Sequence, residues 1–138
     1  MTPRHSSDED YVEKLIHALG HWRALKRCEA AWLLGEKRDP RVIPALVAVL
    51  KSSEDPYVKM EAVIALGKIG GPQVVAPLLD GLRSRQALIV RLAALTALDQ
   101  PVSNEILTAL RQAAESDPST TIRRRARQAL RMLGASGN

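Results

Sequence analysis

A ten-residue pattern recurs four times in the chain at intervals of 32 residues. One copy runs from Val58 to Gly67, and the other copies begin at Lys26, Val90 and Ile122. Three positions of the pattern hold a basic residue, an alanine and a leucine in every copy. They are Arg27, Lys59, Arg91 and Arg123; Ala30, Ala62, Ala94 and Ala126; and Leu34, Leu66, Leu98 and Leu130. A fixed period of this length indicates stacked supersecondary units, because each unit needs a neighbour to cover its apolar face.

Each copy has the apolar spacing of a helix, and another apolar stripe precedes it. Asp-Pro pairs at residues 39–40, 55–56 and 117–118 predict helix starts, since aspartate caps a helix and proline suits its first position. Glycines at 20, 35 and 70–71 predict helix ends. We therefore predict an all-α fold, a right-handed α-α superhelix of eight helices in four antiparallel pairs.

The length of 138 residues suits one domain. We expect the first helix to start near Asp8, which leaves residues 1–7 as a flexible tail, and a second flexible tail at residues 135–138. Between them, residues 8–134 form a single repeat domain. Its predicted units are about 8–37, 38–70, 71–101 and 102–134.

One stretch carries a family resemblance, and it reads Asp55-Pro56-x-Val58-Lys59-x-x-Ala62-x-x-Ala65-Leu66-Gly67. It resembles the second helix of HEAT repeats and is most similar to the short HEAT-like repeats of phycobilin-lyase-type proteins. Asp99 and Arg131 depart from the pattern by replacing the glycine in units three and four. The resemblance implies a non-enzymatic scaffold that binds another protein through its concave face. The repeat type also suggests an alternative, a bilin lyase or chaperone-like role.

Opposite the core stripe, the pattern helices carry apolar residues where a solvated face is expected to be polar. In a solenoid this side forms the concave wall. Two interpretations stay open: the residues pack on adjacent units, or they form a groove for a partner or for self-association, with an aromatic anchor. The candidate partner-binding residues are Cys28, Trp32, Met60, Ile64 and Leu92.

The net charge of +5 is concentrated at the C-terminal end. Residues 119–138 hold five arginines and no acid, and the remaining basic and acidic residues cancel. A terminal unit needs a polar outer face, which explains polarity. A contact with an acidic partner segment or with nucleic acid also explains why the charges share one sign. The candidate residues for this anionic contact are Arg124, Arg125 and Arg127.

The basic column of the repeat has two interpretations as well. Arg27, Lys59, Arg91 and Arg123 could bind phosphate, or each could hold the turn of its own or a neighbouring unit. Charges tied to a repeat motif usually position loops, so we favour the second interpretation. Under it, the acidic turns at Asp55 and Asp117 are candidate partners.

No constellation for catalysis or metal binding stands out. His17 and His21 have the spacing of metal ligands and lie near Cys28, but Gly20 separates them and no fourth ligand is evident. Cys28 has no positioned base that would make it a nucleophile. The sequence has no phosphate loop and no nucleophile elbow. We predict no enzymatic activity, no metal and no cofactor.

Composition favours a cytoplasmic protein that does not enter the membrane. Apolar residues make up 46% of the chain but aromatic residues only 3%, so the core must consist of Leu, Val, Ile and Ala. The single Cys28 allows no internal disulfide. The polar N-terminus lacks the apolar run of a signal peptide, and no apolar stretch approaches the roughly 20 residues that span a bilayer.

Overall fold

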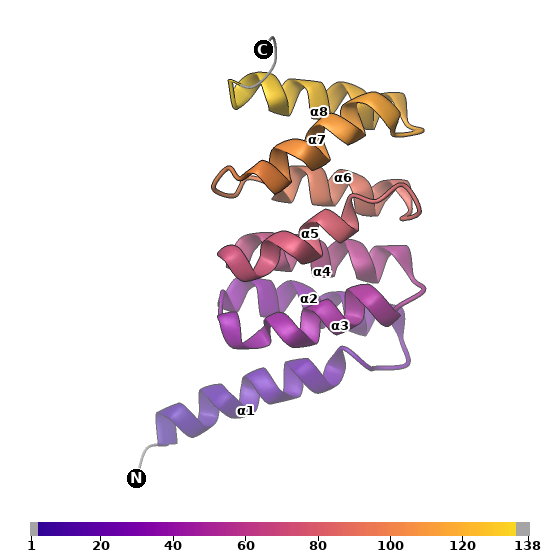
Figure 1. Cartoon of the computed structure of the whole chain (residues 1–138). Helices are drawn as coiled ribbons and strands as arrows, with labels where there is room; N and C mark the ends of the chain where they lie inside the picture. Colours follow the sequence, from indigo (N-terminus) through magenta and orange to yellow (C-terminus); the bar gives the residue numbers. More distant parts are fainter. Residues whose placement is uncertain (1–2, 135–138) are drawn as a thin grey trace.

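The computed structural model describes residues 3–134 and has eight α-helices and no strand within that range. Consecutive helices form four pairs, which Figure 1 shows stacked along one axis. The pairs are α1 (Pro3–Ala18) with α2 (Ala24–Lys37), α3 (Ile43–Ser52) with α4 (Pro56–Ile69), α5 (Val75–Gly81) with α6 (Leu88–Ala97), and α7 (Asn104–Ser116) with α8 (Thr120–Met132). The predicted all-α solenoid is confirmed, and the right hand of its superhelix stays a prediction.

The helices form two layers. In one layer α2 contacts α4, α4 contacts α6, and α6 contacts α8; in the other, α5 contacts both α3 and α7 (Figure 1). Helices α2, α4, α6 and α8 begin at Ala24, Pro56, Leu88 and Thr120, which are 32 residues apart. Residues 32 apart therefore occupy equivalent positions on successive helices of this layer, and the sequence period can be used as a map of its outer face.

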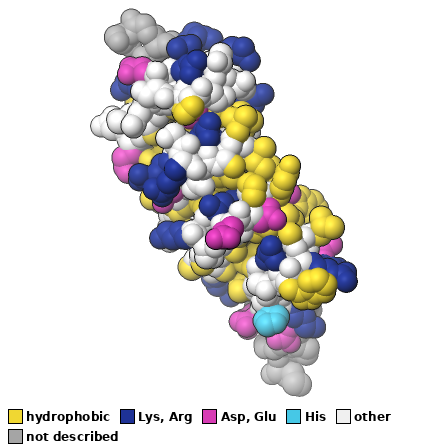
Figure 2. Space-filling view, turned by 90° about the vertical axis from the view of Figure 1, so that its right-hand side faces the viewer, with side chains coloured by type: hydrophobic (Ala, Val, Ile, Leu, Met, Phe, Trp, Pro, Cys, Tyr) yellow, Lys and Arg dark blue, Asp and Glu magenta, His cyan; other side chains and the backbone are white. Residues whose placement is uncertain are grey.

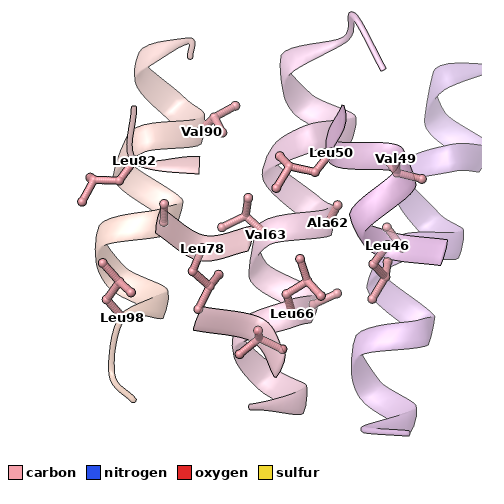
Figure 3. Packing of buried hydrophobic residues seen from close by; sticks show 14 of the residues in the cluster. Leu46, Val49, Leu50, Ala62, Val63, Leu66, Leu78, Leu82, Val90 and Leu98 are labelled. Carbon is pink, nitrogen blue, oxygen red and sulfur yellow. The ribbon is translucent and has the colours of Figure 1, made fainter. Parts of the chain in front are cut away.

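The core lies between the two layers. Figure 3 shows Leu46 and Leu50 of α3, Leu78 of α5, and Val63 and Leu66 of α4 in one buried cluster. The apolar stripe of α3 is buried throughout, and it consists of Ile43, Leu46, Val49 and Leu50. The alanine and leucine columns of the repeat are buried as well. Another column was not predicted to be buried, and its members in the first three units are Ala31, Val63 and Leu95.

The prediction that Gly35 ends a helix is wrong. α2 continues to Lys37, and Arg38 caps its end in the left-handed conformation. Gly35 is buried in the helix because a Cβ there would lie 2.9 Å from both Cα and Cβ of Ala65 on α4. Gly67 has the same role one unit later, where a Cβ would lie 2.7 Å from Cβ of Ala97 on α6. The glycines of the repeat let neighbouring second helices approach closely.

Most predicted helix starts are confirmed. The carboxylate of Asp55 accepts hydrogen bonds from the backbone N–H groups of Tyr57 and Val58 at the start of α4. Asp39 accepts one from Arg41 at a 3-10 turn, Pro40–Val42, that leads into α3. A second 3-10 turn, Pro72–Val74, leads into α5 after two glycines with positive φ angles.

The last helix starts slightly later than predicted at Asp117-Pro118, because Ser119 and not Asp117 is the N-cap of α8. The Ser119 hydroxyl accepts a hydrogen bond from the Ile122 N–H. The carboxylate of Asp117 is instead occupied by the Ser119 N–H and by Arg91 of α6. Asp117, which the sequence predicts as a helix cap, instead forms an ion pair with Arg91 of the preceding unit.

The first helix starts earlier than predicted. α1 begins at Pro3 and not near Asp8, so residues 3–7 of the predicted tail are helical. Proline is tolerated in the first turn because the N–H that it lacks has no partner inside the helix there. The acids at 8–10 lie beyond the first turn. Residues 1–2 and the predicted C-terminal tail at 135–138 lie outside the described range.

Candidate functional site

The layer of α2, α4, α6 and α8 has one side that faces away from the core, which we call the outer face; it is the side that the sequence predicts as the concave wall. This face carries a groove of about 480 Å³ between α4 and α6. Apolar side chains from both helices dominate it, with Lys68, Asp99 and Gln100 toward the C-terminal ends of the helices. Figure 2 shows hydrophobic side chains gathered along its right-hand edge, the side of the molecule on which α2, α4 and α6 lie. The apolar lining consists of Met60, Ile64, Ile89, Leu92, Ala93 and Ala97.

Three of the five predicted partner-binding residues meet in this groove. Met60 and Ile64 come from α4 and Leu92 from α6, and each is half-buried. Sequence reasoning missed Ile89 and Ala93, whose equivalents one unit earlier are Tyr57 and Glu61. Equivalent positions of the repeat therefore hold polar or aromatic residues in one unit and small or aliphatic residues in the next. Only the contact between neighbouring helices shows which of these residues line the groove.

Trp32 and Cys28 lie one helix away from the groove, on α2. The Trp32 side chain is 47% exposed, so it is not a core residue. Nζ of Lys68 lies 5.4 Å from the centroid of the Trp32 ring and also pairs with Glu36. A cation at this distance over an aromatic face is attracted to it. Trp32 thus extends the apolar surface of the groove toward α2.

Cys28 is half-buried and lies in an acidic environment. Burial raises the pKa of its thiol, and the nearby charges of Glu61 and Asp55 raise it further, against a smaller opposing effect of Arg27. A raised pKa leaves little thiolate at neutral pH. The environment opposes a nucleophilic role, since burial and the nearby Glu61 and Asp55 all disfavour the thiolate.

Two members of the basic column form hydrogen bonds to the turns that precede their own helices. Arg27 donates to the carbonyl oxygens of His21 and Trp22, at 2.6 and 3.1 Å, and Arg123 donates to those of Asp117 and Pro118, at 2.7 and 3.2 Å. These carbonyls precede the helix that carries the arginine. Guanidinium groups engaged in this way are held by their own turns, which supports the structural interpretation for these two residues.

The other two members of the column reach the neighbouring unit. Lys59 donates to the side chain of Gln86 at 3.3 Å. Arg91 donates to the Gln86 carbonyl at 2.5 Å, and its guanidinium pairs with Asp117, with Nε 3.0 Å from Oδ2 and Nη2 3.2 Å from Oδ1. Arg91 and Asp117 are only 6% and 4% exposed. This buried ion pair joins α6 to the turn before α8.

The three arginines of the predicted anionic contact are exposed on α8, but they do not share one face. Arg124 and Arg125 are equivalent to Leu92 and Ala93, which both line the groove, whereas Arg127 is equivalent to the buried Leu95. Arg125 is equivalent to Ala93, which faces the preceding helix in the groove. Arg125 is therefore on the α6 side of α8, and Arg127 is on a side that no other helix of the described residues covers.

The described residues contain no group of three His, Cys, Asp or Glu side chains that could hold a metal ion. Nδ1 of His21 accepts a hydrogen bond from the N–H of Arg23 at 3.0 Å. Within residues 3–134, no helix combines the length and apolar character needed to cross a bilayer.

The paired helices, their two layers and the outer groove define the chain as an α-solenoid with an open apolar surface. The family model for HEAT repeats matches residues 12–99, which is more than half of the chain. The chain belongs to the HEAT-repeat family. HEAT repeats are generally protein-interaction scaffolds. A comparison with curated proteins gives no match.

Proposed function

We propose that this protein is a non-enzymatic scaffold that binds another protein through the outer face of α2, α4 and α6. One observation carries the proposal: half-buried apolar side chains form an open groove that no helix of the described chain covers. Contiguous apolar surface of this kind, rimmed by polar residues, marks interaction sites. Met60, Ile64 and Leu92 supply the floor of the groove, and Trp32 supplies an aromatic anchor beside it.

The alternatives have less support in the structure. Nucleic-acid binding through α8 and a bilin lyase or chaperone-like role stay predictions, as do the phycobilin-lyase subtype of the repeats and a cytoplasmic location. The groove contains one acid, Asp99, and no second carboxylate that could act with it in acid–base chemistry. Apolar recognition therefore accounts for more of this surface than catalysis does.

The test uses the full chain as bait in the native host extract, with substitutions that separate binding from folding. Leu92→Glu and Trp32→Ala should each abolish retention of a specific partner. Val102→Glu is the matched control, because Val102 is 51% exposed and lies outside the groove. Trp32→Ala should change the free energy of unfolding by no more than about 1 kcal/mol, as for surface positions. A loss of about 3–5 kcal/mol, the cost of removing a core aromatic, would contradict the assignment.

A further inference from the structure

The repeat positions that form the groove floor recur on α8, where their chemistry changes. Met60, Leu92 and Arg124 are 32 residues apart and occupy equivalent outward positions on α4, α6 and α8. The first two line the groove, and α6 contacts α8. A segment that crosses the outer face from α4 and α6 to α8 therefore passes from apolar side chains to a guanidinium group.

A second column shows the same change with opposite charges at its two ends. Its members, from α2 to α8, are Glu29, Glu61, Ala93 and Arg125. Glu61 of this column also adds to the effect of burial in raising the pKa of the Cys28 thiol. This column of the outer face therefore runs from acidic on α2 and α4, through Ala93 in the groove, to basic on α8.

The basic end is accessible and held in place. Arg124 and Arg125 are exposed, and no ion pair involves either of them within residues 7–134. α8 is anchored by the buried Arg91–Asp117 pair and by the bonds from Arg123 to the turn that precedes it. A fixed helix with exposed guanidinium groups is well suited to bind carboxylates, which arginine can engage through two hydrogen bonds.

We propose that the partner segment in the groove carries carboxylates next to its apolar residues, and that these carboxylates pair with Arg124 and Arg125. The proposal rests on the proposed function, since it names the chemistry of the partner at the same face. It also fixes a direction: the acidic end of the segment lies on α8, and its apolar residues lie between α4 and α6.

A protein segment fits this surface better than nucleic acid does. A phosphate backbone following the stack would meet the apolar floor and then the acids Glu61 and Glu29, which repel it. A nucleic-acid footprint is instead a continuous basic stripe. Lys68 also lines the groove, but it is paired with Glu36 and lies over Trp32, so the negative charge of the ligand is expected at the α8 end.

The stacking geometry gives the spacing of the motif. Packed helices lie about 8–10 Å apart, and we take that range as the separation expected between Leu92 on α6 and Arg124 on α8. A helical ligand rises 1.5 Å per residue, and an extended one about 3.3 Å. The carboxylate should therefore lie about five to seven residues from the apolar anchor in a helix, or about three residues from it in an extended segment.

The experiment selects ligands without assuming their sequence. A random peptide library displayed on phage is panned against the immobilised full chain, and enriched peptides are synthesised with a fluorescent label. Dissociation constants are then measured by anisotropy for wild type, Arg124→Glu, Arg125→Glu and Leu92→Glu. Arg111→Glu is the matched charge control, because Arg111 is exposed on α7 in the other layer.

Enriched peptides should carry apolar and acidic residues at one of these spacings. Each reversal on α8 should weaken their binding about five- to thirtyfold, from the loss of one surface ion pair and a similar repulsion, and the control should change it less than about twofold. Enrichment of peptides without acids, no enrichment, or unchanged binding by both α8 variants would overturn the proposal. If Leu92→Glu still abolishes binding in that case, the groove function stands alone. Binding of labelled single-stranded DNA at low salt that Arg124→Glu abolishes, without peptide enrichment, would assign α8 to nucleic acid and also overturn it.

Discussion

A methyl group added at Gly67 should collide with α6, and the collision should disappear when Ala97 is replaced by glycine. A Cβ at Gly67 would lie 2.7 Å from Cβ of Ala97 and 3.4 Å from its Cα. The first distance is far below the 3.5–4.0 Å at which carbon atoms attract, and the second is close to ordinary contact. Ala97 has no flexible side chain that could move aside, so the two helices must separate.

The magnitude follows from two opposing effects. Overpacking a close contact costs about 1–3 kcal/mol, whereas glycine to alanine in a helix gains up to about 1 kcal/mol. Gly67→Ala alone should therefore reduce the free energy of unfolding by about 1 kcal/mol. In the Ala97→Gly background only the gain remains, and the same substitution should stabilise by about 0.5 kcal/mol or more. The double-mutant cycle should give a coupling of about 1–3 kcal/mol.

The assay is urea denaturation of the four proteins in the cycle, followed by both circular dichroism and tryptophan fluorescence. Gly35 provides the contrast, because its Cβ would lie 2.9 Å from Cα as well as Cβ of Ala65. Ala65→Gly removes only the Cβ, so Gly35→Ala should stay destabilising in that background. Additive free energies at Gly67 and Ala97, or stabilisation by Gly67→Ala alone, would refute the close-approach argument.

Two further predictions concern buried charge and the acidic surface. Arg91→Met should lower the free energy of unfolding by about 3–5 kcal/mol in urea, because it leaves Asp117 buried without its counter-charge, whereas Arg27→Met should cost only about 1 kcal/mol for lost hydrogen bonds to a turn. Equal losses would contradict this. Because burial and Glu61 raise the pKa of the Cys28 thiol, less thiolate forms at a given pH, so alkylation by iodoacetamide should reach half its maximal rate at a higher pH than for free cysteine. Glu61→Gln should lower that pH, and an unperturbed midpoint in the wild type would contradict the acidic environment.

The architecture could be predicted from the sequence because the residues that determine it recur at a fixed period. A column that repeats every 32 residues identifies both the helix face and the stacking register, and the helix starts at Ala24, Pro56, Leu88 and Thr120 keep that register. A local capping signal also predicted the start of α4, because the Asp55 carboxylate accepts hydrogen bonds from N–H groups in the first turn of that helix. Such features depend on residues a few positions apart or on one fixed period.

Features that depend on the neighbouring unit were mispredicted. Gly35 looks like a helix end, and only the approach of Ala65 shows why a residue without Cβ is needed inside α2. Asp117 looks like a helix cap, but Arg91, which is 26 residues away, takes its carboxylate. In both cases the local pattern is satisfied by more than one structure, and packing between units decides which one forms.

The same packing explains why the candidate site ends at α8. Glycines at 35 and 67 bring α2, α4 and α6 close together, so that α4 and α6 share one apolar groove and Trp32 of α2 lies beside it. The residue equivalent to Gly67 in the third unit is Asp99, which is exposed and lies beyond the end of α6. The equivalent residue in the fourth unit is Arg131. Without the glycine there is no requirement for close approach, and α8 can carry long charged side chains at positions that are small or apolar on α6. The departures from the repeat in unit four therefore change a packing surface into a charged one, at the boundary where the direction of a bound segment is proposed to be recognised.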